Sequence, residues 1–71
     1  MVTLRDFCRL FLEPDFQRIA VYEVTDDGVS RDLIQDTARA VGRSEYGECY
    51  VQGIDPIIDG DTVLAVCIMT D

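Results

Sequence analysis

Three carboxylates lie close together in the segment DPIIDGDT, residues 55–62, and they raise the question of a cation site. Asp55, Asp59 and Asp61 carry the oxygen ligands that Ca²⁺ and Mg²⁺ prefer. A calcium loop needs six or more oxygens around the ion, however, and the spacing of an EF-hand with its terminal Glu is absent. Asp59-Gly60 is instead a strong hairpin signal between strand-like residues. We therefore interpret the three carboxylates as solvated turn residues rather than as metal ligands.

Residues suited to catalysis are few. The chain contains no histidine, which removes the usual general base near neutral pH and the commonest metal ligand. The carboxylates recur along most of the chain, and none stands in the apolar setting that tunes a catalytic acid. The serines lie in no G-x-S-x-G elbow, and the glycines occur singly rather than in a phosphate-binding loop. The sequence therefore predicts no catalytic residue, no metal site and no cofactor, and a protein that is not an enzyme.

The cysteines could in principle form disulfides, bind zinc or do redox chemistry. The chain has three cysteines, an odd number, at Cys8, Cys49 and Cys67. They lie far apart in the sequence, and each has apolar neighbours. That pattern is neither a CxxC motif nor the framework of a secreted disulfide protein. We interpret all three as reduced core residues of a cytoplasmic protein. Charged residues interrupt the apolar N-terminal segment, and no apolar run approaches the length of a membrane span, so we expect neither a signal peptide nor a membrane helix.

Length and charge restrict the function further. The 71 residues predict a single domain, residues 1–71. A chain of this size buries only about 60% of its unfolded surface, which leaves little room for a deep substrate pocket. Fourteen acidic residues face six basic ones, all arginine, and the net charge is −8. Such a surface repels nucleic acid and anionic membranes, so the natural partner is a basic surface of another protein.

The elements that must position these residues begin with a helix. Near the N-terminus apolar residues recur at helical spacing, namely at Leu4, Phe7, Cys8, Phe11 and Leu12. This pattern predicts a helix near residues 3–12. Thr3 is suited to cap its first turn, and Pro14 ends the element.

The middle of the chain contains one clear strand and one ambiguous segment. Residues 18–25 are rich in β-branched and aromatic side chains and predict a strand, which the Asp-Asp-Gly turn at 26–28 ends. Residues 29–33 fit either a short return strand or the direct start of a helix. Helical spacing, acidic residues early and arginines late favour a helix near residues 31–41.

Two further strands are predicted at residues 48–54 and 62–69, with Asp55-Pro56 as a kink or strand entry between them. The order becomes α-β-α-β-β, or α-β-β-α-β-β if the return strand forms. The fold class is α+β, with a small mixed or antiparallel sheet of three or four strands and two helices on one face.

The last predicted strand is apolar on both faces. Leu64, Val66 and Ile68 alternate with Val63, Ala65, Cys67 and Met69. The strand is either central and covered on both faces by its own chain, or part of a face buried in a homodimer. The three tyrosines, which lack surrounding basic residues, are interpreted as core or interface residues rather than base-stacking platforms.

Two classes of function remain. The first is a non-enzymatic acidic interaction module, whose carboxylates stand in for nucleic-acid phosphates and pair with Arg and Lys of a nucleic-acid-binding protein. The candidate partner-binding residues are Glu23, Asp26, Asp27, Glu45, Glu48, Asp55, Asp59 and Asp61. In its size, its acidity and its lack of catalytic groups the chain resembles phage-encoded inhibitors of host nucleases, including anti-CRISPR and other DNA-mimic proteins. No motif carries this resemblance.

The alternatives belong to other classes. One is a structural or assembly subunit that forms a homo-oligomer through the apolar strand face. The other is a small metal-dependent activity, with Asp, Glu and Tyr from two subunits forming the site. It predicts a discrete carboxylate cluster in a cleft, whereas scattered surface carboxylates would count against it.

Overall fold

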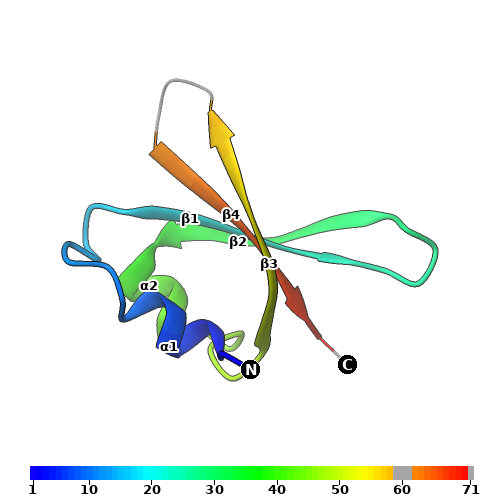
Figure 1. Ribbon diagram of the computed structural model, residues 1–71, viewed down its shortest axis with the longest axis horizontal. Coiled ribbons are helices and arrows are strands. Elements are labelled where there is room, and N and C mark those ends of the chain that lie inside the picture. The colour runs from blue at the N-terminus through cyan, green and yellow to red at the C-terminus, as the bar shows by residue number, and fades with distance from the viewer. Residues whose placement is uncertain (59–61, 71) are drawn as a thin grey trace.

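The computed structural model of the chain describes residues 1–58 and 62–70, with side chains described at 1–55 and 63–70. Figure 1 shows two short helices packed beside a single sheet. In chain order, the elements of this described part are α1 (Leu4–Cys8), β1 (Arg18–Val24), β2 (Ser30–Thr37), α2 (Ala38–Gly42), β3 (Tyr50–Ile58) and β4 (Thr62–Met69). The predicted α+β class is confirmed, in the version of the order that includes a strand before the second helix.

The sheet has four strands in the order β2-β1-β4-β3. β1 pairs with β2 and β3 pairs with β4 in antiparallel fashion, whereas the two central strands β1 and β4 are parallel. The sheet is therefore mixed. The parallel register sets Ile19 beside Leu64 and Val21 beside Val66, so the apolar residues of both central strands share one face.

The predicted helix near residues 31–41 is wrong over most of its length, because residues 30–37 form strand β2. The return-strand alternative is the correct one. The turn after β1 brings β2 back along it, with the backbone N–H of Gly28 donating to the Thr25 carbonyl at 2.8 Å. Gly28 has φ of 80°, which glycine adopts without strain. β2 can then form its ladder of hydrogen bonds with β1, which local helical spacing does not reveal.

Helix α2 corresponds to the last part of the predicted second helix. Thr37 caps it, since its hydroxyl accepts a hydrogen bond from the Ala40 N–H at 3.3 Å. The backbone N–H groups of Ala38 and Arg39 donate to the carbonyls of Gln17 and Pro14. The first turn of α2 is therefore tied to the segment that leads into β1.

Helix α1 is shorter than predicted. Thr3 caps it as expected, accepting from the Asp6 N–H at 3.2 Å, but the helix ends at Cys8 rather than near residue 12. The chain then turns, and Phe11 packs edge-on against Phe7 with ring centroids 5.4 Å apart. Leu12, predicted on the buried stripe, is 99% exposed. A longer helix is incompatible with the segment's attachment to the start of α2.

The β3–β4 hairpin pairs from Tyr50 opposite Met69 to Ile58 opposite Thr62. β3 is longer than predicted: Asp55-Pro56, expected to mark a kink or a strand entry after residue 54, lies within the strand. Proline is tolerated there because β3 is an edge strand of the sheet. The predicted Asp59-Gly60 turn lies outside the described residues.

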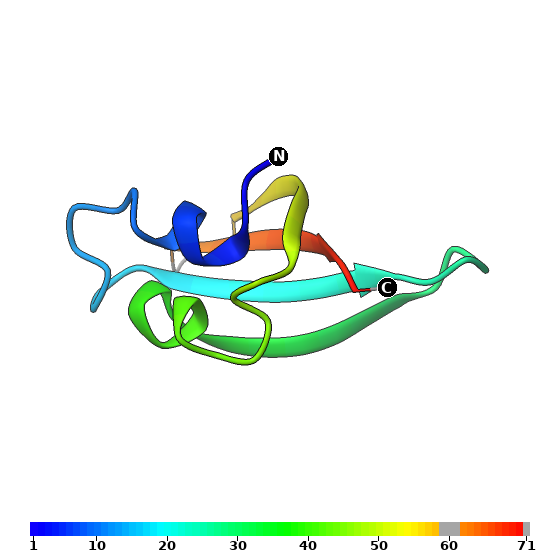
Figure 2. The same ribbon diagram turned by 90° about the horizontal axis from the view of Figure 1, so that it is seen from below.

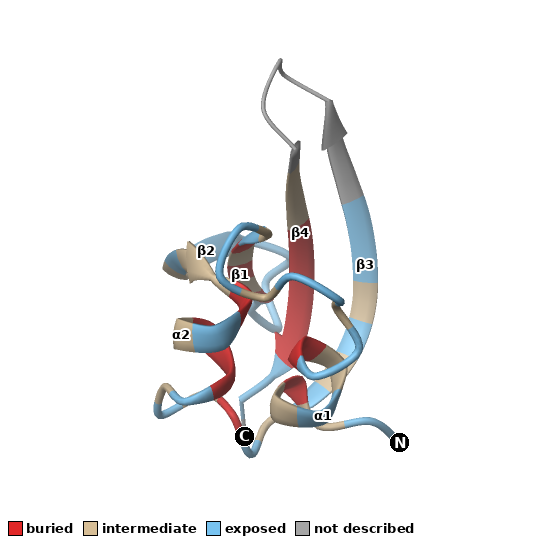
Figure 3. Ribbon diagram, turned by 90° about the vertical axis from the view of Figure 1, so that its left-hand side faces the viewer, coloured by how far each residue is buried: buried red, intermediate tan, exposed pale blue. Residues whose placement is uncertain are grey.

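The core lies between the helices and one face of the sheet (Figure 3). Its buried members come from both helices and both central strands: Leu4, Cys8, Ile19, Val21, Ala38, Val41, Val66 and Ile68. Gly42 allows α1 and α2 to approach closely, because a Cβ added there would lie 3.2 Å from the Cys8 Cβ. Among the described residues, no helix is long and apolar enough to span a membrane.

We call the other face of the sheet, away from the two helices, the open face. Ala65 and Cys67 of β4 are only 5% and 8% exposed. Cys67 lies beside Tyr22 of β1 in the register, and its thiol donates to the Gln52 side-chain carbonyl at 3.6 Å. The middle of β4 is therefore buried on both faces within one chain, although Met69 at its end is exposed. All three cysteines are unpaired, and Cys49 is half-buried.

Candidate functional site

The structure distributes the predicted partner-binding carboxylates over separate parts of the molecule. Asp26 and Asp27 lie at the tip of the β1–β2 hairpin, which extends past both helices (Figure 2). Glu45 and Glu48 lie in the loop after α2, and Asp55 lies on the edge strand β3. All five are exposed. Asp59 and Asp61 are outside the described residues.

Glu23 is buried in the sheet rather than exposed at the surface. It is 7% exposed, although it was predicted to contact a partner. Its carboxylate pairs with the Arg31 guanidinium of β2 and accepts a hydrogen bond from the Thr70 hydroxyl after β4. Glu23 therefore connects three neighbouring stretches of the sheet. Glu48 is also engaged, because it forms an exposed ion pair with Arg5 of α1.

The open face combines an apolar centre with carboxylates at its edges. Strand alternation places Val24 of β1 and Met69 of β4 on this face, and both are partly exposed. Asp32 pairs with Tyr22 in the register of β2 and β1, and Asp55 pairs with Ala65 in that of β3 and β4. The acidic residues therefore flank the apolar centre from the two edge strands.

Tyr22 at this centre has a perturbed phenol. Burial raises the pKa of Tyr22 first of all, and the nearby charges of Cys67 and Asp55 raise it further. The Tyr22 hydroxyl therefore stays neutral at physiological pH. The influence of Asp55 shows that this edge carboxylate lies within electrostatic reach of the centre of the open face.

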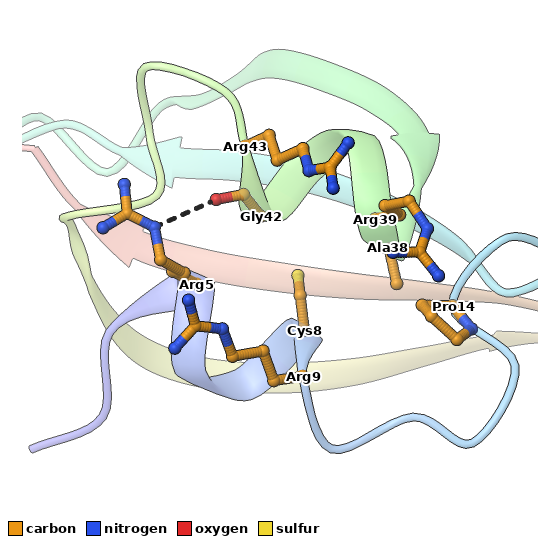
Figure 4. Close-up of a pocket in the computed structure, with 8 residues that line it drawn as sticks. All are labelled: Arg5, Cys8, Arg9, Pro14, Ala38, Arg39, Gly42 and Arg43. Carbon is orange, nitrogen blue, oxygen red and sulfur yellow. Dashed lines mark hydrogen bonds between the residues drawn. The ribbon is translucent and has the colours of Figure 1, made fainter.

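A second site was not predicted from the sequence: a cleft of about 220 Å³ between α1 and α2. Four of the six arginines line it, namely Arg5, Arg9, Arg39 and Arg43. Cys8, Pro14, Ala38 and Gly42 complete its lining (Figure 4). We call this cleft the arginine groove. Its concentration of positive charge is unexpected in a chain of net charge −8.

Local sequence and close helix packing together build the arginine groove. Arg5 and Arg9 are four residues apart at α1 and its C-cap, and Arg39 and Arg43 are spaced likewise at α2. Residues at this spacing lie on one side of a helix. The small Gly42 lets the two helices meet closely, so the two arginine pairs border one cleft. The paired R-x-x-x-R spacing was the signal available in the sequence.

Acidic neighbours balance three of the four groove arginines. Arg5 pairs with Glu48 and also donates from Nε to the Gly42 carbonyl at 3.4 Å. Arg39 Nε donates to Asp15 Oδ1 at 2.6 Å, and this hydrogen bond and charge raise the pKa of Arg39. The other pair joins Arg9 and Asp6, with nitrogen and oxygen 3.7 Å apart.

The remaining groove arginine, Arg43, forms no ion pair with any residue that the structure describes. The Cys8 thiol lies at the floor of the same cleft (Figure 4). Burial raises the pKa of Cys8 to about 11. Cys8 is therefore a neutral thiol at physiological pH, not a thiolate nucleophile.

Next to the arginine groove, the segment after α1 exposes large apolar side chains. Leu10 is 75% exposed and Phe16 is 80% exposed, and Leu12 lies between them. Single exposed apolar residues are ordinary, but three in one short segment form a patch of the kind that marks interaction sites. We call residues 10–16 the apolar loop.

Within the described side chains, no group of three or more Cys, Asp or Glu residues is arranged to hold a metal ion. No protein-family model, no curated protein sequence and no solved structure matches the chain. The function must therefore be inferred from the open face, the arginine groove and the apolar loop themselves.

Proposed function

We propose that the chain is a non-enzymatic interaction module that binds a basic surface of another protein in the cytoplasm through its open face. The observation that carries this proposal is the separation of charge. Four arginines are gathered at the helices, which leaves Arg18 and Arg31 as the basic residues elsewhere in the chain. Arg31 pairs with Glu23, and Arg18 is the one arginine that strand alternation places on the open face. The carboxylates of the open face and the hairpin tip therefore outnumber the arginines there.

The make-up of the open face suits a protein partner. Protein interfaces commonly have an apolar centre with a polar rim. Val24 and Met69 supply exposed apolar surface, and Asp32 and Asp55 supply charge at the edges. The hairpin tip with Asp26 and Asp27 extends this acidic rim. Carboxylates held on a sheet need little ordering when they pair with arginine or lysine.

The specific form of the proposal is inhibition by mimicry. A basic groove that normally holds DNA or RNA phosphates presents the arginines and lysines that an acidic rim would pair with. The chain would then block a nucleic-acid-binding protein, in the manner of the phage-encoded inhibitors that it resembles in type. Support comes from the rigid sheet that carries Asp32 and Asp55 and from the segregated arginines.

A capture experiment with matched variants tests the proposal. Tagged wild-type protein, D32N/D55N and E13Q/E45Q are incubated with nuclease-treated bacterial lysate at low salt. Each double variant removes two exposed carboxylates, but E13Q/E45Q leaves the open face unchanged. We expect D32N/D55N alone to lose a captured nucleic-acid-binding protein, and we expect high salt or added DNA duplex to release that protein from the wild type.

Equal capture by both double variants would contradict use of the open face. Capture that DNA duplex does not compete for would contradict mimicry while leaving an acidic docking surface in place. Recovery of the chain alone, at any salt concentration, would favour the second candidate function.

That second candidate is a homo-oligomeric structural subunit, and the apolar loop is the observation that favours it. Leu10, Leu12 and Phe16 are exposed on a single chain and would be buried by self-association. Light scattering of the purified protein over a range of concentrations distinguishes a monomer from an oligomer. An oligomer dissociated by L12S but not by D32N/D55N would support this candidate.

A further inference from the structure

We propose that the arginine groove binds a small multivalent oxyanion of the phosphate or pyrophosphate class. This site is distinct from the open face, since α1 and α2 form it on the helix side of the sheet (Figure 4). Four arginines line this one cleft. The proposal does not depend on a protein partner.

The guanidinium groups have donors to spare. Each arginine side chain carries five N–H donors. Arg5 uses Nε and Nη1 on Gly42 and Glu48, and Arg39 uses Nε on Asp15. Among the described residues, Arg9 and Arg43 donate no side-chain hydrogen bond. Most of the donors around the groove thus remain available to a ligand.

The existing ion pairs do not neutralise or close the groove. Asp6, Asp15 and Glu48 balance three positive charges but leave that of Arg43. The paired carboxylates are largely exposed, and ion pairs between exposed groups are weak because water screens them. A multivalent anion can therefore compete with these carboxylates for the arginines.

The size and floor of the groove indicate a small ligand. Its volume of about 220 Å³ is below the roughly 300–1,000 Å³ typical of pockets for drug-sized molecules. Ala38 and the Cys8 thiol form part of the lining. Since burial raises the pKa of Cys8 to about 11, this thiol adds no negative charge that would repel an anion.

The type of cation also favours an oxyanion. A guanidinium presents a planar fork of donors that matches two oxygens of one phosphate or carboxylate group. Two pairs of such forks, one from each helix, favour a ligand with several charged oxygens over a single carboxylate. We therefore expect pyrophosphate to bind more tightly than phosphate, and phosphate more tightly than acetate.

Titrations followed by amide NMR test this site. ¹⁵N-labelled protein is titrated with pyrophosphate, phosphate and acetate, each at the ionic strength of a sodium chloride control. We expect saturable shifts for pyrophosphate, concentrated at residues 5–9 and 38–43. Arg43→Gln should weaken binding about tenfold, the loss expected for one charge-assisted contact.

The controls separate a site from general charge attraction. Arg18→Gln removes an exposed arginine on β1 outside the groove and should leave pyrophosphate affinity within about twofold. Arg43→Lys keeps the charge but loses the fork, and should weaken binding less than Arg43→Gln. Arg43 is exposed, so both variants should keep the wild-type spectrum.

Three results would overturn the proposal. The first is pyrophosphate shifts no larger than those of sodium chloride at equal ionic strength. The second is equal weakening by Arg18→Gln and Arg43→Gln, and the third is acetate affinity equal to that of pyrophosphate. Failure of the open-face variants to capture a partner would not bear on any of these measurements.

Discussion

The two faces of the sheet use neighbouring residues of β4 in different ways. Val66 and Ile68 pack under the helices with the other large core side chains. Ala65 and Cys67 turn to the open face, where small size and nearby side chains keep them buried. The helix side therefore carries most of the packing, and the open face can present acidic edges without disturbing it.

The same division separates the charges. Arginines border the groove between α1 and α2, whereas carboxylates flank the open face. Three of the groove arginines are balanced by carboxylates, but Arg43 has no ion pair among the described residues and suits an anion. Asp32 and Asp55 at the edges of the open face suit a basic protein surface. Substitutions on the two sides should differ accordingly, and four comparisons of stability sharpen or break this contrast.

The largest difference is expected between adjacent residues of β4. Ile68 is buried under the helices, and Ile68→Ala should lower the free energy of unfolding by about 2–5 kcal/mol through lost burial and a cavity. Met69 is partly exposed on the open face, and Met69→Ala should cost under about 1 kcal/mol. Urea unfolding followed by circular dichroism measures both. Equal losses would show that the open face contributes as much packing as the helix side.

Two glycines, one beside the arginine groove and one on the open face, allow the same comparison through the space around their backbone. A Cβ at Gly47 would lie 2.7 Å from the Gly42 carbonyl oxygen, so Gly47→Ala must displace backbone beside the groove. We expect a loss of about 1–3 kcal/mol. Gly53 of β3 pairs with Cys67 of β4, and a Cβ added at Gly53 would have no atom within 4 Å. Gly53→Ala should therefore change stability by about 0.5 kcal/mol or less. The difference in urea midpoint between the two variants checks this, and a larger loss for Gly53→Ala would refute it.

The buried carboxylate of Glu23 should matter more than the exposed ones. Glu23→Gln weakens the pair with Arg31 and the hydrogen bond from Thr70. The expected loss is about 1–2 kcal/mol, because Arg31 is exposed and water can replace part of the interaction. Asp26→Asn at the hairpin tip should change stability by less than about 0.5 kcal/mol. Thermal unfolding of both variants is the measurement, and equal effects would mean that Glu23 behaves as a surface residue.

The smallest effect at neutral pH is expected from the Cys8 thiol. Folding raises the pKa of Cys8 from 9.0 to about 11, so the folded chain holds this proton where the unfolded chain releases it. Stability should therefore be unaffected below pH 9 and should fall between about pH 9 and pH 11. Urea unfolding from pH 8 to pH 11 should show a shallower fall for Cys8→Ala than for the wild type. Tyr22, whose pKa is also raised, contributes to the fall in both, and an identical slope would exclude Cys8 as a source.

Several features were predictable because they depend on a few neighbouring residues. Thr3 caps α1 as the sequence predicts, and the Asp-Asp-Gly turn reverses the chain after β1. β1 and β4 were placed nearly to the residue by their β-branched and apolar side chains. The net charge and the lack of histidine follow directly from the amino-acid composition.

The ambiguous segment was decided by its partner. Residues 31–41 carry apolar side chains at helical spacing, but residues 30–37 pair with β1 along its whole length. In the same way, α1 ends early because residues 14 and 17 hydrogen-bond the start of α2. Neither contact can be read from a window of a few residues, because the groups that supply it lie elsewhere in the chain.

The sequence by itself determined the α+β class, the acidic surface and the local turns and caps, because propensity, charge and capping act between residues close in the chain. Only the tertiary structure decided that Glu23 is buried between Arg31 and Thr70, and that two R-x-x-x-R pairs border one groove. Both depend on segments far apart in sequence being brought together. The close approach of α1 and α2 at Gly42, together with the parallel pairing of β1 with β4, is the physical reason.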